Sequence, residues 1–339
     1  MPLKIIRDDI TKVKADAIVN TANPYPRYAA GTDRAVYEAA GADQLLAQRK
    51  RIGIISEGQV AVTDAFALPA RFIIHTVGPQ WKDGNSGEFD ILRACYANSL
   101  QKAYDLGCDS VAFPLIATGV YGFPKDQALQ TAVSCIGSFL MHHEMLVLLV
   151  VFDMDSYQLS TRFMGQVQSF IDETRIAEAV KKEYSIQSEN RIERNVFCSC
   201  HKEEPSHFGS SFQDELVSLS VAQTLEDTKT FQEKMFEIME KKGMVSTDVY
   251  KAANIDRKLF SKIRSDKFYK PSKTTAIAFA LALELPLSEM QDMLRKAGFT
   301  LSHSSKFDII VEFFVQQGNY NVFEINEALF AFDQRLIGM

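Results

Sequence analysis

Residues 111–124 read VAFPLIATGVYGFP and join an apolar run, a glycine-containing loop and a proline. The run Val111–Ile116 predicts a buried β-strand, and the helical pattern Lys125–His142 begins after Pro124, whose φ is pre-set for a helix. Five more apolar runs predict strands: Leu3–Ile6, Ala17–Val19, Val60–Val62, Phe72–Ile74 and Met145–Phe152. Further helical patterns cover Asp33–Gln48, Glu88–Leu106 and Tyr157–Glu183. Strands that alternate with helices indicate an α/β domain whose mostly parallel sheet is covered on both faces.

The chain changes character twice after this domain. Residues 1–183 carry the alternating pattern, whereas 184–226 mix serine and charge with little periodicity and predict a linker. Residues 227–339 predict a smaller all-α domain, with five short helices in 227–300 and two more in a tail at 301–339. A length of 339 residues agrees with two domains.

Composition restricts the possible classes of function. A formal net charge of −6 argues against a protein that coats nucleic acid along its whole length. The five cysteines are odd in number and lack a framework spacing, which favours reduced thiols and a cytoplasmic location. The longest apolar run, Met145–Phe152, is far shorter than the roughly 18 residues that a membrane span needs, so we expect no membrane partner.

Unusual residues follow the predicted strands where each strand ends. Asp9 and Ile10 follow the first strand, and Asn20 and Asn23 the second. In open α/β sheets ligands bind outside the carboxyl ends of the strands. Two glycine-containing loops that open onto helix N-termini suit a diphosphate, because backbone N–H groups and the helix dipole favour negative charge. Each feature also has a purely structural reading: turn-shaping glycines, asparagines that cap loops, Asp33 as an N-cap and His75 as a structural histidine.

Four ordered blocks carry a family resemblance: DDITKVKADAIVNTAN, GTDRAVYEAAG, GQVAVTDAFALPARFIIHTVGPQW and FPLIATGVYGFP. Over roughly residues 1–175 the chain resembles the macrodomain family. The resemblance implies a mixed six- or seven-stranded sheet between helices. It also implies binding of ADP-ribose, free or on a protein, and hydrolysis of ADP-ribose esters such as O-acetyl-ADP-ribose without a cofactor or metal.

The resemblance also implies roles for individual residues. Asp9 would accept a hydrogen bond from the adenine amino group beside Ile10, Asn23 would hold the distal ribose, and Asp33 would orient the attacking water. The catalytic pair is therefore Asn23 and Asp33. The other expected ligand-binding residues are Asn20, Ala30, Gly31, Thr118, Gly119, Val120, Tyr121, Gly122, Phe123 and Phe152. For Phe152 the alternatives are stacking on adenine and packing in the core.

The loop before Asp33 departs from the family pattern. Hydrolytic members often carry a run of glycines there, whereas this chain has Arg27-Tyr28-Ala29-Ala30-Gly31. The Ala29 and Ala30 methyl groups tolerate φ > 0 poorly, and Tyr28 could clamp or block the ribose. This departure favours an alternative function, a non-catalytic sensor of ADP-ribose or an NAD metabolite that regulates binding of DNA or protein by the C-terminal bundle. The presence of Asp33 ten positions after Asn23 favours the enzyme.

The segment NIDRKLFSKIRSDKFYKPSKTTAIAFALAL is similar to repressor-type helix-turn-helix bundles. Between Lys251 and Lys273 there are eight bases and two acids, a local charge of +6. One hypothesis is contact with duplex DNA. In it, the side chains that face base edges are Arg257, Lys258 and Ser261. Those that lie near phosphates are Lys262, Lys267 and Lys270. The alternatives are a solvated face and a bundle that docks proteins.

Two further clusters in the C-terminal half carry alternatives. Five tail aromatics predict either a bundle core or a homodimer surface: Phe313, Phe314, Phe323, Phe330 and Phe332. Four side chains of the linker have ligand types suited to zinc, but their spacing fits no common site, so no metal is predicted: Cys198, Cys200, His201 and His207.

Overall fold

A six-stranded mixed sheet forms the centre of the N-terminal domain. The computed structural model describes residues 2–151, 165–175, 177 and 229–338. The strands are β1 (Leu3–Arg7), β2 (Ala17–Thr21), β3 (Val60–Asp64), β4 (Phe72–Thr76), β5 (Ser110–Pro114) and β6 (Leu146–Val151). They lie in the order β1-β6-β5-β2-β4-β3, and only the edge pair β3–β4 is antiparallel. The predicted fold class is confirmed.

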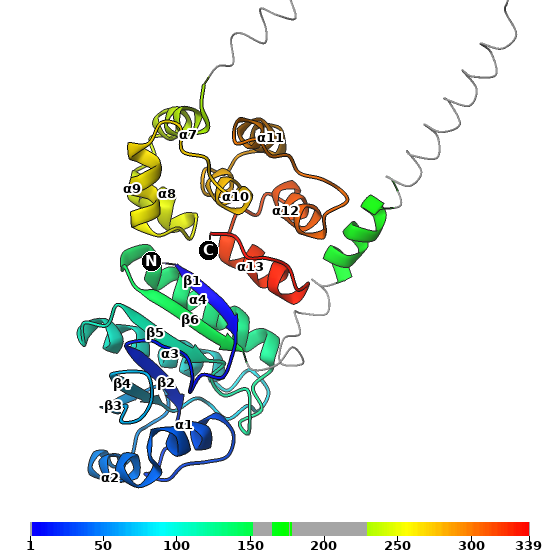
Figure 1. The fold of residues 1–339 in the computed structure, drawn as a ribbon. Helices are drawn as coiled ribbons and strands as arrows, with labels where there is room; N and C mark the ends of the chain where they lie inside the picture. Colours follow the sequence, from blue (N-terminus) through cyan, green and yellow to red (C-terminus); the bar gives the residue numbers. More distant parts are fainter. Residues whose placement is uncertain (1, 152–164, 176, 178–228, 339) are drawn as a thin grey trace, which may run out of the picture.

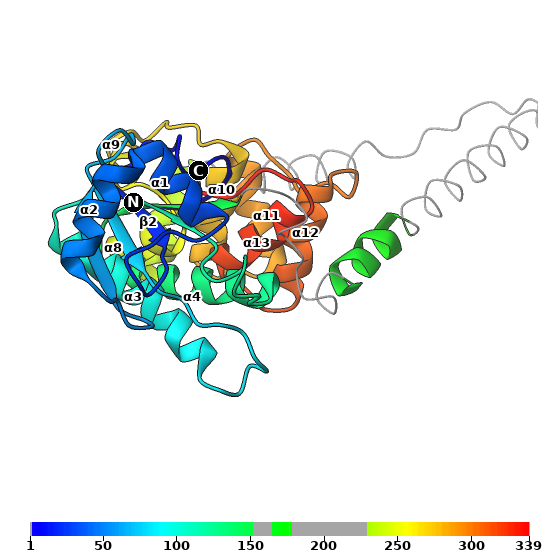
Figure 2. The same cartoon turned by 90° about the horizontal axis from the view of Figure 1, so that it is seen from below.

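Helices cover both faces of this sheet, as Figures 1 and 2 show. Helices α3 (Glu88–Asp105) and α4 (Lys125–His142) cover one face, and α1 (Thr32–Ala40) and α2 (Ala42–Ile52) the other. Strand β6 illustrates why an uninterrupted apolar run forms here. Val147 and Leu149 pack with α3 and α4, while Leu148 and Val150 pack against the opposite layer. A strand buried on both faces needs apolar residues at every position.

The prediction of a single helix over Asp33–Gln48 is wrong. It is two helices, because Gly41 adopts φ 104 and ends α1 before α2 begins. Few residues other than glycine reach this φ, and Gly41 is thus a helix break that the apolar periodicity on either side concealed. The expected helix Tyr157–Glu183 is described as helical at 165–175, and most of its remainder lies outside the described residues.

The described C-terminal region is entirely helical. Its helices are α7 (Phe231–Lys241), α8 (Ser246–Ala252), α9 (Arg257–Ser265), α10 (Lys273–Ala282), α11 (Leu287–Lys296), α12 (Lys306–Gln316) and α13 (Val322–Ala331). Side-chain caps define several starts. Thr230 and Glu233 form a capping box before α7, and Asp256, Ser272 and Ser305 accept N–H bonds at the starts of α9, α10 and α12.

The helical domain packs on β1 and α4 of the sheet domain (Figure 1). Strand β1 is an edge strand, and Asn254 bonds to its free side. The Leu3 amide donates to Asn254 Oδ1 at 2.8 Å, and Asn254 Nδ2 donates to the Leu3 carbonyl at 3.0 Å. The Asn254 amide thus takes the place of a neighbouring strand and covers an edge that would otherwise be open to pairing.

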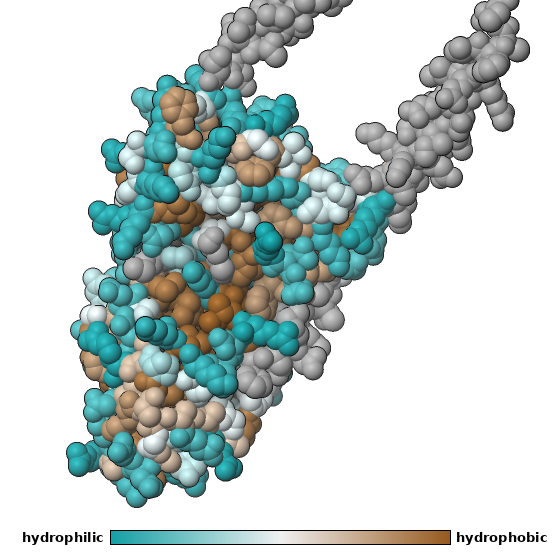
Figure 3. Space-filling view, viewed as in Figure 1, coloured by the Kyte–Doolittle hydropathy of each residue, from teal (hydrophilic) through white to brown (hydrophobic). Residues whose placement is uncertain are grey.

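Apolar contacts complete this junction, and Figure 3 shows apolar side chains gathered where the two parts meet. Phe313 and Phe314 are buried in the common core, which agrees with the core alternative for the tail aromatics. Phe323 instead packs against α4 of the sheet domain. A Cβ atom built on Gly137 of α4 would lie 3.2 Å from the Phe323 ring. The homodimer surface stays a prediction.

Candidate functional site

The carboxyl ends of five parallel strands lie along one edge of the sheet. From the edge inward they belong to β1, β6, β5, β2 and β4. The predicted ligand residues follow these ends, with Asp9 after β1, the loop 117–123 after β5, and Asn20 and Asn23 at β2. His75, which also has a structural reading, lies in β4. Phe152 follows β6 and lies outside the described residues. The fold therefore brings the predicted residues from distant parts of the sequence to one edge.

Asp9 organises the turn after β1. Its Oδ1 accepts hydrogen bonds from the Thr11 amide at 3.0 Å and the Thr11 hydroxyl at 2.7 Å. Its Oδ2 lies 3.3 Å from the Lys12 ammonium. The Thr11 hydroxyl bond is the main cause of a lowered Asp9 pKa, so the side chain is a carboxylate at neutral pH and accepts hydrogen bonds only. Ile10 beside it is buried.

The loop after β5 has the backbone geometry of an anion cradle. Ala117 and Gly122 have φ 64 and 68, and the Phe123 amide closes the loop by donating to the Ala117 carbonyl at 3.0 Å. In the described part of the chain, the N–H groups of Gly119, Val120 and Tyr121 have no hydrogen-bond acceptor. Helix α4 begins directly after this loop, so its N-terminal dipole adds to these free donors.

Aromatic side chains pack against the loop 117–123 and hold it in place. The Trp81 amide donates to the Tyr121 carbonyl at 2.9 Å, and the Trp81 ring lies 4.7 Å from that of buried Phe123. Glu88 holds the turn that follows Trp81, because its carboxylate accepts four backbone N–H bonds from residues 82–86. Burial raises the pKa of Glu88, but these bonds outweigh it and lower the pKa to about 2. Neither Trp81 nor Glu88 was predicted as a site residue.

A buried polar network lies at the ends of β2 and β4. Asn20 Nδ2 donates to Asp33 Oδ1 at 2.7 Å and lies 3.1 Å from His75 Nδ1. Since Nδ2 is a donor, His75 Nδ1 is the acceptor nitrogen, and its Nε2–H points at Thr63 Oγ1, 2.9 Å away. Burial lowers the pKa of His75 to about 3, with the Arg49 charge as a second cause. His75 is therefore neutral and does not titrate between pH 5 and 8.

Asp33 is almost completely buried, with 1% of its surface exposed. Its Oδ2 accepts the Ala29 amide at 2.7 Å, and its Oδ1 the Asn20 amide. Burial raises the pKa of Asp33, and the bonds from Ala29 and Asn20 and the charge of Arg49 oppose that shift. Asp33 is not the N-cap of α1, because Gly31 occupies that position with φ 74.

The loop that departs from the family pattern is unstrained. Gly31 has φ 74, whereas Ala29 and Ala30 are not among the residues with positive φ, so their methyl groups meet no backbone penalty. Tyr28 lies over buried Tyr37 with ring centroids 4.9 Å apart. The loop thereby covers Asp33 in this arrangement. Asn23 is half-buried, and its Oδ1 accepts the Tyr25 amide at 3.0 Å.

Some of the residues of the helical domain that are predicted to contact duplex DNA form ion pairs within the protein. Arg257 at the start of α9 lies 4.0 Å from Glu144 of the sheet domain, and Lys267 pairs with Glu233 at 2.8 Å. Lys262 lies over the Tyr269 ring. Lys258, Ser261 and Lys270 are exposed. Contact of these residues with DNA stays a prediction.

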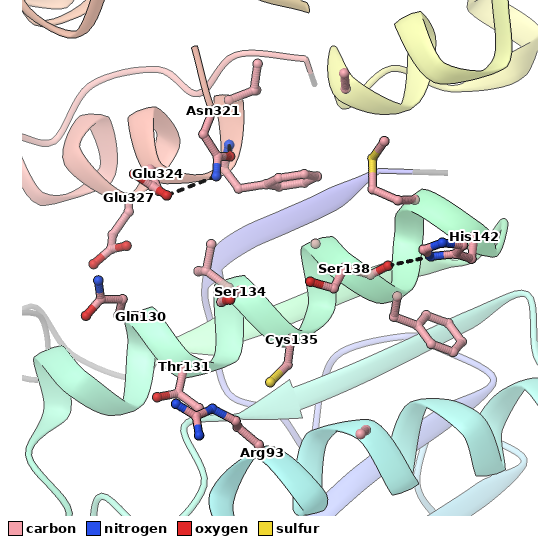
Figure 4. A pocket seen from close by; sticks show the side chains of 18 of the residues that line it. Arg93, Gln130, Thr131, Ser134, Cys135, Ser138, His142, Asn321, Glu324 and Glu327 are labelled. Atoms are coloured by element: carbon pink, nitrogen blue, oxygen red, sulfur yellow. Dashed lines mark hydrogen bonds between the residues drawn. The ribbon is translucent and has the colours of Figure 1, made fainter. Parts of the chain in front are cut away.

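A separate groove of about 1660 Å³ runs between α3 and α4 on one side and α13 on the other. Figure 4 shows Glu327 and Gln130 pointing toward one another across it. Burial, followed by the nearby Glu324 and Asp126 charges, raises the pKa of Glu327 to about 8. None of the predicted ADP-ribose residues lines this groove.

Within the described residues, no helix combines the length and apolar character that crossing a bilayer requires. In the same residues, no three His, Cys, Asp or Glu side chains are grouped to hold a metal. The candidate zinc ligands Cys198, Cys200, His201 and His207 lie outside the described residues.

Gly78 is expected to set the position of the loop after β5. A Cβ at Gly78 would lie 2.9 Å from both Ala117 Cβ and Ile116 Cγ2. We expect Gly78→Ala to lower the free energy of unfolding by about 1–3 kcal/mol, as overpacking does. The measurement is urea unfolding of the full chain. Gly119→Ala is the matched control, because a Cβ there meets no atom within 4 Å. Equal stability of the two variants would contradict the assignment.

Comparison with known proteins identifies the family of the N-terminal half. The family model described as "Macro domain" matches residues 19–132. A macro domain-containing protein of Methanosarcina mazei is 42% identical over 167 residues, which are 49% of this chain and 89% of that protein. An O-acetyl-ADP-ribose deacetylase of Escherichia fergusonii is 38% identical over 169 residues, 48% of this chain and 96% of that protein. An Oceanobacillus iheyensis macrodomain structure with ADP is 37% identical and covers 46% of this chain, 85% of its own, with a TM-score of 0.44. Through its N-terminal half, the chain belongs to the macrodomain family.

Proposed function

We propose that the N-terminal domain binds ADP-ribose along the carboxyl edge of the sheet and hydrolyses ADP-ribose esters. The observation that carries this proposal is the order of the strands. From β1 to β2 the edge presents Asp9, then β6, then the 117–123 loop, then Asn23. This is the order of adenine, diphosphate and distal ribose along the ligand. At about 4.8 Å per strand, the three steps span about 14 Å, which suits an extended nucleotide diphosphate.

The electrostatics support the same orientation. Asp9 is a carboxylate that accepts, and the adenine amino group donates. The diphosphate is an anion, and the loop offers the free N–H groups of Gly119, Val120 and Tyr121 at the start of a helix. Asn20 Oδ1 is a buried acceptor with no partner in the described structure, and a donor from water or the ribose would satisfy it.

The reaction proposed is hydrolysis of an ester on the distal ribose. Asp33 takes a proton from water as the water oxygen attacks the carbonyl carbon of the ester. The bond between the acyl carbon and the ribose oxygen then breaks, Asp33 returns its proton to that oxygen, and a carboxylic acid and ADP-ribose leave. A raised pKa suits Asp33 to this task, because a general base works best when its pKa lies nearer the working pH. Asn23 holds the ribose in place.

One observation favours the alternative function, a sensor without turnover. The Ala29 amide occupies Asp33 Oδ2, and the Tyr28 loop covers the carboxylate. If the protein is a hydrolase, water takes the place of the Ala29 amide at Asp33 Oδ2. In the sensor, the loop stays closed over Asp33 and the bound ligand alters binding of DNA or protein by the helical domain. The two alternatives share the binding step and differ in ester turnover.

Binding is tested by calorimetry of ADP-ribose with the full chain. We expect Asp9→Ala to weaken binding at least about tenfold, since it removes a charged acceptor and its loss costs about 1.5–3 kcal/mol. Asp43→Ala, at an exposed acid in the first turn of α2, is the control. No heat from folded wild-type protein at millimolar ligand would contradict the proposal.

A further inference from the structure

A buried arginine lies next to the proposed catalytic residues. Arg49 is in the last turn of α2, within the basic run Arg49-Lys50-Arg51, yet only 1% of it is exposed. Lys50 and Arg51 are exposed, as charged residues of a surface helix normally are. A guanidinium always carries its charge, so burial is costly unless its donors and charge are compensated.

The partners of Arg49 join α2 to the ribose side of the site. Its Nη1 donates to the Gly53 carbonyl at 2.9 Å, and its Nη2 lies 3.3 Å from the Asn23 carbonyl. Arg49 also interacts electrostatically with Tyr37 of α1. The planar guanidinium of Arg49 thus fixes the backbone of Asn23 against α1 and α2. A lysine could not bond to the Gly53 and Asn23 carbonyls in the same way.

The same charge acts on Asp33. Arg49 lowers the Asp33 pKa against the effect of burial. Among the described residues, Tyr37 and Tyr121 also interact with Asp33, and both have a raised pKa and are therefore neutral. His75, on β4, is neutral as well. Arg49 is thus the cation that compensates the buried carboxylate.

We propose that Arg49 is a positioning residue: its buried guanidinium, bonded to the Gly53 and Asn23 carbonyls, fixes the Asn23 backbone for the distal ribose and brings a positive charge to this side of the site. The consequence for catalysis rests on the proposed ester hydrolysis, whereas the effects on Asp33 and on ligand affinity do not. Because a nearby cation stabilises a carboxylate, removal of Arg49 moves the titration of Asp33 to higher pH. Activity that needs the carboxylate then falls as pH falls through this higher value.

The test measures the Asp33 carboxyl by ¹³C NMR titration and ADP-ribose affinity by calorimetry, both on the full chain. We expect Arg49→Gln to move the Asp33 titration upward and weaken ADP-ribose binding on the order of tenfold, since a small misplacement of a positioned group has large effects. Arg51→Gln, on the same helix but exposed, should change neither. A residue with a merely structural role would lower the melting temperature without moving the titration.

Arg49→Lys separates the two roles and serves if Arg49→Gln does not fold. It keeps the charge and loses the planar guanidinium, so the Asp33 titration should stay near that of wild type while ADP-ribose binding weakens. If wild type hydrolyses no ester but the titration and affinity move as expected, the hydrolase proposal fails and the role of Arg49 stands. An unchanged Asp33 titration in folded Arg49→Gln, or unchanged affinity in Arg49→Lys, would overturn it.

Discussion

Asp33→Asn should hydrolyse O-acetyl-ADP-ribose at least about 100-fold more slowly than wild type, the lower end of what general-base catalysis contributes. The amide cannot take a proton from water. It also places an NH₂ group where Asp33 now accepts donors from Ala29 and Asn20, so one of these bonds is lost. Single-turnover measurement of ester cleavage at saturating enzyme reports the chemical step directly.

The control for this prediction is Asp43→Asn, an exposed acid in the first turn of α2. Calorimetry with ADP-ribose shows whether Asp33→Asn still binds, which separates lost chemistry from a collapsed site. A hydrolysis rate within about threefold of wild type would remove Asp33 from the mechanism. Wild-type protein that binds ADP-ribose but cleaves neither O-acetyl-ADP-ribose nor a carboxylate-linked ADP-ribosylated protein would favour the sensor.

Asn254→Ala should lower the free energy of unfolding by about 3 kcal/mol. The substitution leaves the buried Leu3 N–H and carbonyl without partners, at about 1–3 kcal/mol for such a group. Asn254 also has φ 55, a conformation that alanine adopts at a cost of about 1–2 kcal/mol. Equilibrium urea unfolding of the full chain measures the change.

Asn254→Gly divides this loss into its two parts. Glycine accepts φ 55 without strain but makes neither bond to Leu3, so it should recover about 1 kcal/mol relative to alanine. If both variants lose less than about 1 kcal/mol, the Asn254 bridge does not hold the helical domain on the sheet. Equal losses would show that the backbone conformation contributes nothing.

The strands of the sheet were predictable because the sequence signal of each strand is local. Each strand buried on both faces is an apolar run, and the loops after β2 and β5 carry asparagines and glycines at the positions where the backbone turns. The break at Gly41 had a visible signal, the glycine itself, but the apolar spacing on both sides continued across it. Local patterns therefore placed most elements and misjudged only where one helix ends.

The residues that sequence reasoning missed depend on contacts between distant segments. Leu3 and Asn254 are 251 positions apart, and nothing in either local sequence marks the pair. Arg49 stands in a run of bases that is typical of a solvated helix face, and only the packed structure distinguishes it from Lys50 and Arg51. The packing of the Tyr28 ring on Tyr37, nine positions further along, is likewise not marked in the local sequence.

A crystal structure of the full chain with ADP-ribose tests the central claim most directly. The account predicts adenine beside Asp9, the diphosphate on the amides of Gly119, Val120 and Tyr121, and the distal ribose at Asn23. In the hydrolase, the Ala29 amide is no longer bonded to Asp33 Oδ2 in that complex. Ligand bound instead in the groove between α4 and α13, or ADP-ribose in the reverse orientation along the sheet edge, would contradict the account.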